Sequence, residues 1–315
     1  MSDFPKSILI QEVSPRDGLQ IEPKILSTDE KLRLIAALVA AGCREIEAGS
    51  FVNPQAVPQM GDAAELFPRL PRHEGVKYHC LVLNVKGIER ALATPGADLE
   101  GKLSMTASET FIKRNTNRSI EEAFAEMPRW ISAYRAGGLR TRSLAVMAAF
   151  GCNFEGDVPV EDVIGLIART TAIMSENGET LEHVRLADTM GWANPEHIRR
   201  MIGSVRERWP ELDIRLHLHD TRGLAIANIF VALEMGVADF DASVGGLGGC
   251  PFASLKGAAG NVSTEDLVFL CDELGIETGI NLEAIIEASR LAAELVGHPL
   301  PGKLAQAGPP RRSRS

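Results

Sequence analysis

The 315-residue sequence has fewer basic than acidic residues, no closely paired cysteines and no long apolar run. Nowhere does it approach the roughly 18 apolar residues of a membrane span, and the N-terminus MSDFPKSILI lacks a basic segment followed by a long apolar one. The five cysteines are scattered, odd in number and never in a CxxC pair, which is typical of a reduced compartment without a disulfide framework. We therefore expect a cytoplasmic protein that does not enter the membrane.

The charge balance narrows the class of partner. The net charge of −9 argues against a general nucleic-acid surface, because phosphate binding needs clustered Lys and Arg. Small-molecule substrates fit this composition better. The last residues, GPPRRSRS, are basic, but short Pro/Arg/Ser ends are typically disordered, so we expect residues 309–315 to form a disordered tail.

Short β-branched runs alternate with longer amphipathic stretches along the chain. The eight runs are SILIQEV, REIEA, KYHCLVL, LEGKLSM, TRSLAVMAA, EHVRLAD, DIRLHLH and ADFDASV. Eight strand–helix units in about 270 residues indicate a (β/α)8 TIM barrel, which typically takes about 250. An open doubly wound sheet alternates in the same way and stays the alternative fold. We expect one α/β domain over residues 1–308, in which NLEAIIEASRLAAELVG forms an additional C-terminal helix.

Capping residues mark the ends of several helices. Ser27 or Thr28 stands before an acidic first turn, and Gly42, Gly138 and Gly178 follow helical patterns. In a barrel, functional residues gather where the strands end and the following loops begin, and several polar residues of this sequence fall there. The strand-end candidates are Arg16, Asp17 and Gln20 after the first strand, Glu47 and Ser50 at the second, Asp188 at the sixth, and His217 and His219 at the seventh.

The HxH pair is the first sign of a metal site. His217 and His219 point to one face of their strand, about 6–7 Å apart along it. With an aspartate at another strand end and Asn261 after the glycine-rich loop, they offer mixed oxygen and nitrogen ligands, which suit Mg or Mn. Zinc fits less well, because no cysteine stands at ligand spacing. Taken singly, each residue also has a structural interpretation as a turn, an ion pair or a harmless stack.

The stretch GGLGGCPFASLKGAAGN, residues 245–261, holds six glycines and Cys250. Glycine adopts backbone conformations that other residues resist, so this stretch alone fits a hinge, a phosphate cradle or a lid. The remaining motifs decide between them.

Five segments in order resemble the 3-hydroxy-3-methylglutaryl-CoA (HMG-CoA) lyases, a family of metal-dependent TIM-barrel enzymes: EVSPRDGLQ, EIEAGSFVNPQAVPQMGD, HLHDTRG, GGLGGCPFA and GNVSTEDLV. The resemblance runs over nearly the whole chain. It implies that the divalent ion is bound by Asp17, His217, His219 and Asn261. It also implies catalytic roles for Arg16, Cys250 and His217, with Cys250 on a mobile loop that closes over the site. We expect Gln20, Glu47, Ser50 and Asp188, together with Arg16, to contact the substrate.

A lyase of this kind cleaves a 3-hydroxyacyl-CoA between C2 and C3, and from HMG-CoA it yields acetoacetate and acetyl-CoA. A divalent ion lowers the pKa of the tertiary hydroxyl and can chelate a second substrate oxygen, while Arg16 faces the thioester oxygen, where negative charge develops. The resemblance further implies a homo-oligomer, such as a dimer, and a role in leucine degradation.

Three departures from the family pattern leave the acyl group open. The loop from Cys250 to Asn261 is two residues longer than usual, Arg222 and Leu224 replace a tyrosine and a polar residue, and Ile21 replaces an asparagine. Related substrates such as citramalyl-CoA therefore stay in view, and Arg222 is either an additional anion contact or a structural arginine. Lys86, Lys113 and Arg114 are candidates for the CoA phosphates in loops at the barrel mouth.

Three other functions are weighed against the lyase. A Claisen-type synthase generally carries additional C-terminal domains, whereas we expect one additional helix after the barrel here, which disfavours the synthase. A non-catalytic barrel has no reason to keep the metal and arginine residues together. A zinc hydrolase needs further ligands, and His79 and His183 sit mid-strand or at a strand start, which disfavours it.

Overall fold

Eight parallel strands form the centre of the protein in a computed structural model, which describes residues 4–249 and 260–310. Their bounds differ from the sequence prediction by at most two residues at any end. The strands are β1 (Leu9–Glu12), β2 (Glu45–Ser50), β3 (Lys77–Leu81), β4 (Gly101–Thr106), β5 (Thr141–Met147), β6 (His183–Asp188), β7 (Asp213–Leu218) and β8 (Asp239–Ala242).

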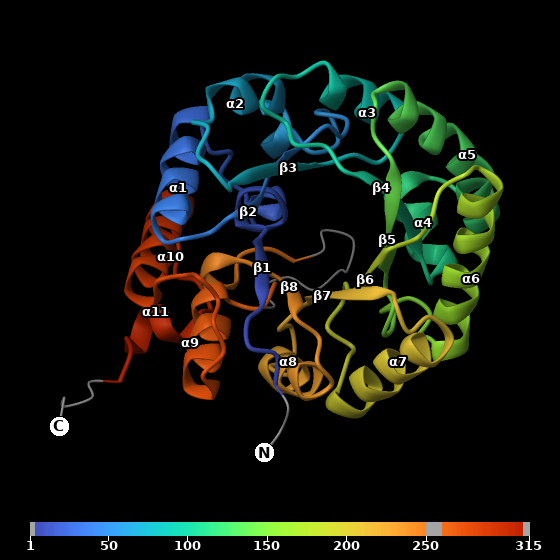
Figure 1. Ribbon diagram of the computed structural model, residues 1–315. Coiled ribbons are helices and arrows are strands. Elements are labelled where there is room, and N and C mark those ends of the chain that lie inside the picture. The colour runs from blue at the N-terminus through green and yellow to red at the C-terminus, as the bar shows by residue number, and fades with distance from the viewer. Residues whose placement is uncertain (1–3, 250–259, 311–315) are drawn as a thin grey trace.

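The strands pair in the order β3-β2-β1-β8-β7-β6-β5-β4. A parallel bridge between His79 and Asp98, just ahead of β4, closes the two ends of this order into a barrel. Helices surround the strands on the outside (Figure 1). The (β/α)8 barrel is therefore confirmed, and the open doubly wound sheet is wrong.

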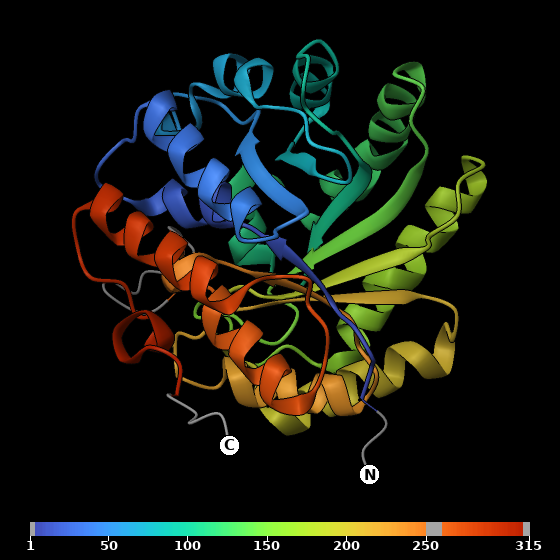
Figure 2. The same ribbon diagram turned by 60° about the vertical axis from the view of Figure 1, so that its left-hand side comes forward.

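The helices of the described residues lie between and after the strands. They are α1 (Thr28–Ala40), α2 (Ala63–Arg69), α3 (Val85–Leu92), α4 (Glu109–Thr116), α5 (Ile120–Ala136), α6 (Val160–Glu176), α7 (Pro195–Arg208), α8 (Ala225–Glu234), α9 (Thr264–Leu274), α10 (Leu282–Val296) and α11 (Lys303–Ala307). Helix α10 is the predicted C-terminal helix; it packs on α1 and α9, and the short α11 follows it (Figure 2).

Local sequence explains where α1 begins and ends. The Ser27 hydroxyl accepts the backbone N–H of Glu30, and the Glu30 carboxylate accepts the Ser27 N–H, which is a capping box. After the helix, Gly42 takes a φ of +107°, and a Cβ there would lie 2.4 Å from the Gly279 carbonyl oxygen. The capping box thus fixes where α1 begins, and Gly42 allows the tight turn that leads from α1 into β2.

The inside of the barrel is unusually polar. In β4, Leu103 and Met105 are buried in the apolar core, whereas the alternate residues Lys102 and Ser104 are half-buried and line a cavity. Barrel interiors are usually filled by bulky branched side chains. The polar residues here leave space for a ligand instead.

Two predictions from the sequence fall outside the description of the structure. Cys250 and residues 311–315 of the basic tail lie outside the described residues. Among the described helices, none is both long and apolar enough to cross a lipid bilayer.

Candidate active site

The loop after β1 carries the first two site residues and is held by a buried carboxylate. Ser14–Gly18 form a π-helical turn, a feature often found at functional sites. Glu12 Oε1 accepts the backbone N–H groups of Ser14 at 2.9 Å and Val244 at 3.1 Å, and the Thr264 hydroxyl donates to Oε2 at 2.6 Å. Glu12 therefore fixes this turn against the segments that follow β8.

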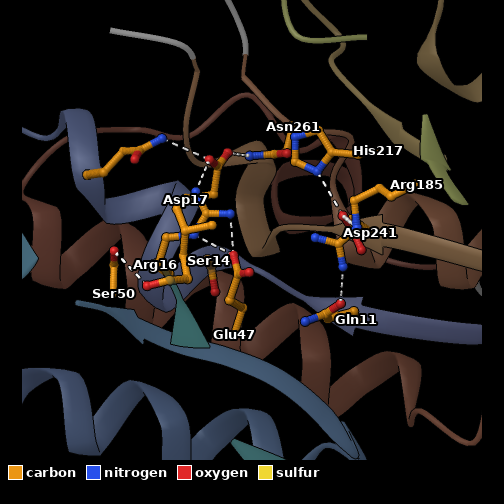
Figure 3. Close-up of polar contacts among 12 residues, drawn as sticks. Gln11, Ser14, Arg16, Asp17, Glu47, Ser50, Arg185, His217, Asp241 and Asn261 are labelled. Carbon is orange, nitrogen blue, oxygen red and sulfur yellow. Dashed lines mark hydrogen bonds and ion pairs between the residues drawn. The ribbon is translucent and has the colours of Figure 1, made fainter. Parts of the chain in front are cut away.

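Arg16 lies between two carboxylates (Figure 3). Its guanidinium donates to Glu47 of β2 and, through Nη1, to Asp17 Oδ1 at 2.6 Å. Burial is the largest single influence and disfavours ionisation of Asp17, but Arg16, the two histidines and the Asn261 hydrogen bond together outweigh it and hold the pKa of Asp17 below its usual value. The same balance, with Glu47 as the main partner, raises the pKa of Arg16. Arg16 is thus a fixed cation, only 7% exposed.

Asp17, His217 and His219 come together as the sequence predicts for a metal site. One ligand atom from each lies within 4.8 Å of the others, and all three residues are buried. The two histidine Nε2 atoms are 3.1 Å apart. Burial, followed by the neighbouring His217, lowers the pKa of His219 to about 4, so His219 is neutral at neutral pH and has a free lone pair.

Two further residues orient this group. Asp241 Oδ2 lies 3.0 Å from His217 Nδ1, so a proton on Nδ1 leaves Nε2 free for a ligand bond. Asn261 Nδ2 donates to Asp17 Oδ2 at 2.7 Å and to the Leu247 carbonyl at 3.0 Å. The Asn261 Oδ1 atom is buried and has no hydrogen-bond partner in the described part of the chain. Carboxylate, imidazole and unpaired amide oxygen together form a donor set that fits a divalent ion.

A cavity of about 460 Å³ opens beside these residues. Arg16, Asp17, His217 and His219 line it, and so do the predicted substrate contacts Gln20 and Ser50. The Gln20 amide also donates to Asp17 Oδ1 at 2.8 Å. The volume of the cavity is within the range of small-molecule sites.

Glu47 and Asp188 are placed behind this lining instead. Glu47 holds Arg16, as described above. The Asp188 carboxylate accepts the backbone N–H groups of Trp192 at 2.7 Å and Ala193 at 3.1 Å, and burial raises its pKa to about 6. Their predicted contact with the substrate stays a prediction, whereas their observed contacts are with the protein.

Arg222 follows β7 and forms hydrogen bonds with the loop after β6. Its Nη1 donates to the carbonyls of Met190 at 2.7 Å and Gly191 at 2.8 Å. Its guanidinium lies 5.6 Å from the Trp192 ring centroid. Of the two interpretations of this arginine, the structural one therefore has contacts in the protein to support it.

The cations expected at the mouth are not in loops. Lys86 lies in α3, and Lys113 and Arg114 lie in α4, so their predicted placement in loops is wrong. The cavity lining instead includes Arg118, Lys102 and Arg185, which sequence reasoning did not single out. For Lys102 and Arg185 a signal was present, because each is a charge inside a strand run.

Comparison with known proteins agrees with this geometry. The family model described as HMGL-like matches residues 7–292. The hydroxymethylglutaryl-CoA lyase of Bacillus subtilis is 39% identical, covering 96% of this chain and 98% of the relative, and the human mitochondrial hydroxymethylglutaryl-CoA lyase is 39% identical, covering 98% and 91%. A solved HMG-CoA lyase from A. baumannii, in complex with coenzyme A and 3-methylmalate, has a TM-score of 0.88 at 40% identity, covering 100% of this chain and 99% of that one. The chain therefore belongs to the HMGL-like family.

Proposed function

We propose that this protein is a metal-dependent lyase that cleaves HMG-CoA into acetoacetate and acetyl-CoA. The observation that carries this proposal is one cavity that holds both the Asp17, His217 and His219 group and the Arg16 guanidinium. The named functions of the full-length relatives support the same reaction.

Asp17, His217, His219 and Asn261 are the residues that would hold the ion, with Mg or Mn as the proposed metals. When bound, a divalent ion supplies a Lewis acid that lowers the pKa of the substrate's tertiary hydroxyl. His217 was also predicted to be catalytic. Because the Nδ1 atom of His217 faces Asp241, only its Nε2 atom faces Asp17 and His219, and we assign Nε2 to metal ligation.

Arg16 would stabilise the charge that develops on the thioester. When the hydroxyl loses its proton and the C2–C3 bond breaks, the electron pair moves to the thioester as an enolate, and C3 becomes the ketone of acetoacetate. A guanidinium already held by Glu47 and Asp17 needs no rearrangement to donate to that oxygen. Glu47 and Asp17 therefore contribute mainly by holding the Arg16 guanidinium in position.

The enolate then takes a proton at C2 to become acetyl-CoA. The family resemblance assigns this proton transfer to Cys250. Glycines on both sides of the cysteine fit a loop that closes and excludes water. We keep that role as part of the proposal. A cytoplasmic location, a homodimer and a citramalyl-CoA substrate also stay predictions.

A coupled assay for acetyl-CoA tests this function. The protein is stripped of metal, and Mg or Mn is added back with HMG-CoA or citramalyl-CoA as substrate. We expect metal-dependent release from HMG-CoA, lost in His219→Ala and retained in His73→Ala, which removes an exposed histidine remote from the site residues. Release from citramalyl-CoA alone would move the proposal to that substrate, and release from neither would overturn it.

A further inference from the structure

Among the described residues, Lys102 differs from the interior arginines, because its ammonium forms no ion pair. Three interior arginines each pair with a carboxylate: Arg16 with Glu47, Arg185 with Asp241, and Arg215 with Asp239. Within residues 4–249 and 260–310, the Lys102 ammonium has neither a hydrogen bond nor a carboxylate within 4.0 Å. An interior ammonium without a partner is costly, which is a reason to look for a ligand.

The position of Lys102 indicates which part of a ligand reaches it. It is the second residue of β4, so it lies deep in the barrel and not at the mouth. It also borders a second cavity, of about 260 Å³, below the first. Lys102 therefore lies at the floor of the upper cavity. A CoA ester enters by its acyl end, and its nucleotide phosphates stay at the mouth, so only the end of the acyl group reaches this floor.

The metal ligands lie on the opposite side of the barrel. The strand order places three strands between β4 and β8 in either direction. The strands on both sides of β8 are β1, which leads into Asp17, and β7, which carries His217. If these residues held an ion that bound the substrate hydroxyl, the rest of the acyl group would face Lys102 across the cavity.

Ser104 adds a hydroxyl to the same floor. It is two residues from Lys102 on β4, so both side chains face the cavity, about 6–7 Å apart along the strand. Its hydroxyl has no hydrogen-bond partner in the described part of the chain. An ammonium and a free hydroxyl side by side are donors suited to a carboxylate.

We propose that Lys102, assisted by Ser104, binds the free carboxylate of the substrate's acyl group, and that the enzyme thereby selects CoA thioesters of dicarboxylic acids. The inference rests on the proposed acyl-CoA lyase function for its ligand class. It adds a residue that determines specificity at a distance from the metal ligands and Arg16. HMG-CoA satisfies it, since its acyl group ends in a carboxylate.

The test compares the binding of glutaryl-CoA and butyryl-CoA to the metal-loaded protein by calorimetry. The two esters differ only in the terminal carboxylate, and neither has a C3 hydroxyl, so neither can be cleaved. We expect the wild type to prefer glutaryl-CoA by about 10- to 100-fold, which is the usual worth of a hydrogen-bonded charge. Lys102→Met should remove most of this preference without weakening the binding of butyryl-CoA. Lys102→Arg, which keeps the positive charge, should retain part of the preference.

Lys77→Met is the matched control. It removes a cation that borders only the lower cavity, where Lys77 already pairs with Glu45 at 3.1 Å, and it should leave the preference unchanged. If Lys102→Met keeps the full preference while it still binds butyryl-CoA, or if the wild type has no preference, the inference is overturned. If the preference depends on Lys102 but HMG-CoA is not cleaved, the carboxylate site stands and the proposed reaction fails.

Discussion

Replacing Lys102 by Met should stabilise the protein in the absence of ligand. Burial, followed by repulsion from Arg185, lowers the pKa of Lys102 from 10.5 to about 8, even though Glu47, Glu100 and Asp241 act in the opposite direction. A lysine whose pKa is lower in the folded state destabilises that state while it is protonated. The cost is therefore complete below about pH 8 and disappears as the pH rises toward 10.5.

The magnitude follows from this shift. A lowering from 10.5 to about 8 corresponds to about 3 kcal/mol, since one pKa unit is about 1.4 kcal/mol. That figure is an upper bound, because the half-buried side chain reaches water through the cavity. We expect Lys102→Met to gain about 1–2 kcal/mol at pH 7, or about 1.5–3 °C in Tm for a chain of this size.

Thermal unfolding of both proteins at pH 7 and pH 10 measures this effect. The gain at pH 7 should shrink at pH 10, and the control Lys77→Met should show neither the gain nor its pH dependence. A lower Tm for Lys102→Met at pH 7 would refute the reasoning. It would mean that the interior carboxylates stabilise Lys102 more than burial costs, and that the ammonium is a structural charge. A gain in stability joined to a loss of binding is the pattern of a functional residue.

Three other changes test the site. Gly248→Ala places a Cβ 2.5 Å from Asn261 Nδ2 at a φ of +110°, so Mn affinity, measured by electron paramagnetic resonance, should fall by about tenfold or more; unchanged affinity would remove Asn261 from the ligand set. Glu47→Gln takes away the charge that holds Arg16, so kcat should fall about 10- to 100-fold with little change in Mn affinity, and an unchanged kcat would contradict the positioning role. Arg222→Ala removes two hydrogen bonds to loop carbonyls, and its free energy of unfolding should drop by about 1–3 kcal/mol; a weaker affinity for CoA esters at full stability would instead indicate an anion contact.

Local patterns in the sequence were sufficient for the barrel and for part of the metal site. Alternation of β-branched runs with capped amphipathic stretches predicts the strands to within two residues, because both patterns depend on neighbours along the chain. His217 and His219 share a face because side chains alternate along any strand. Parallel strands end at one rim, so an aspartate at another strand end was expected near them, and the family resemblance identified it as Asp17.

Only the tertiary structure decided what each polar side chain contacts. Asp188 ends β6 and Gln20 follows β1 at the same rim, yet Gln20 lines the cavity and Asp188 accepts backbone N–H groups of the loop after β6. In the sequence, Lys102 is one of two charged residues in the run LEGKLSM. Its lack of an ion pair among the described residues depends on carboxylates from other strands that pair with arginines. The sequence determined which residues reach the rim and the interior, because that follows from local periodicity. The packing of eight strands decided which of the described charges form ion pairs and that the Lys102 ammonium forms none, because pairing depends on residues far apart in the chain.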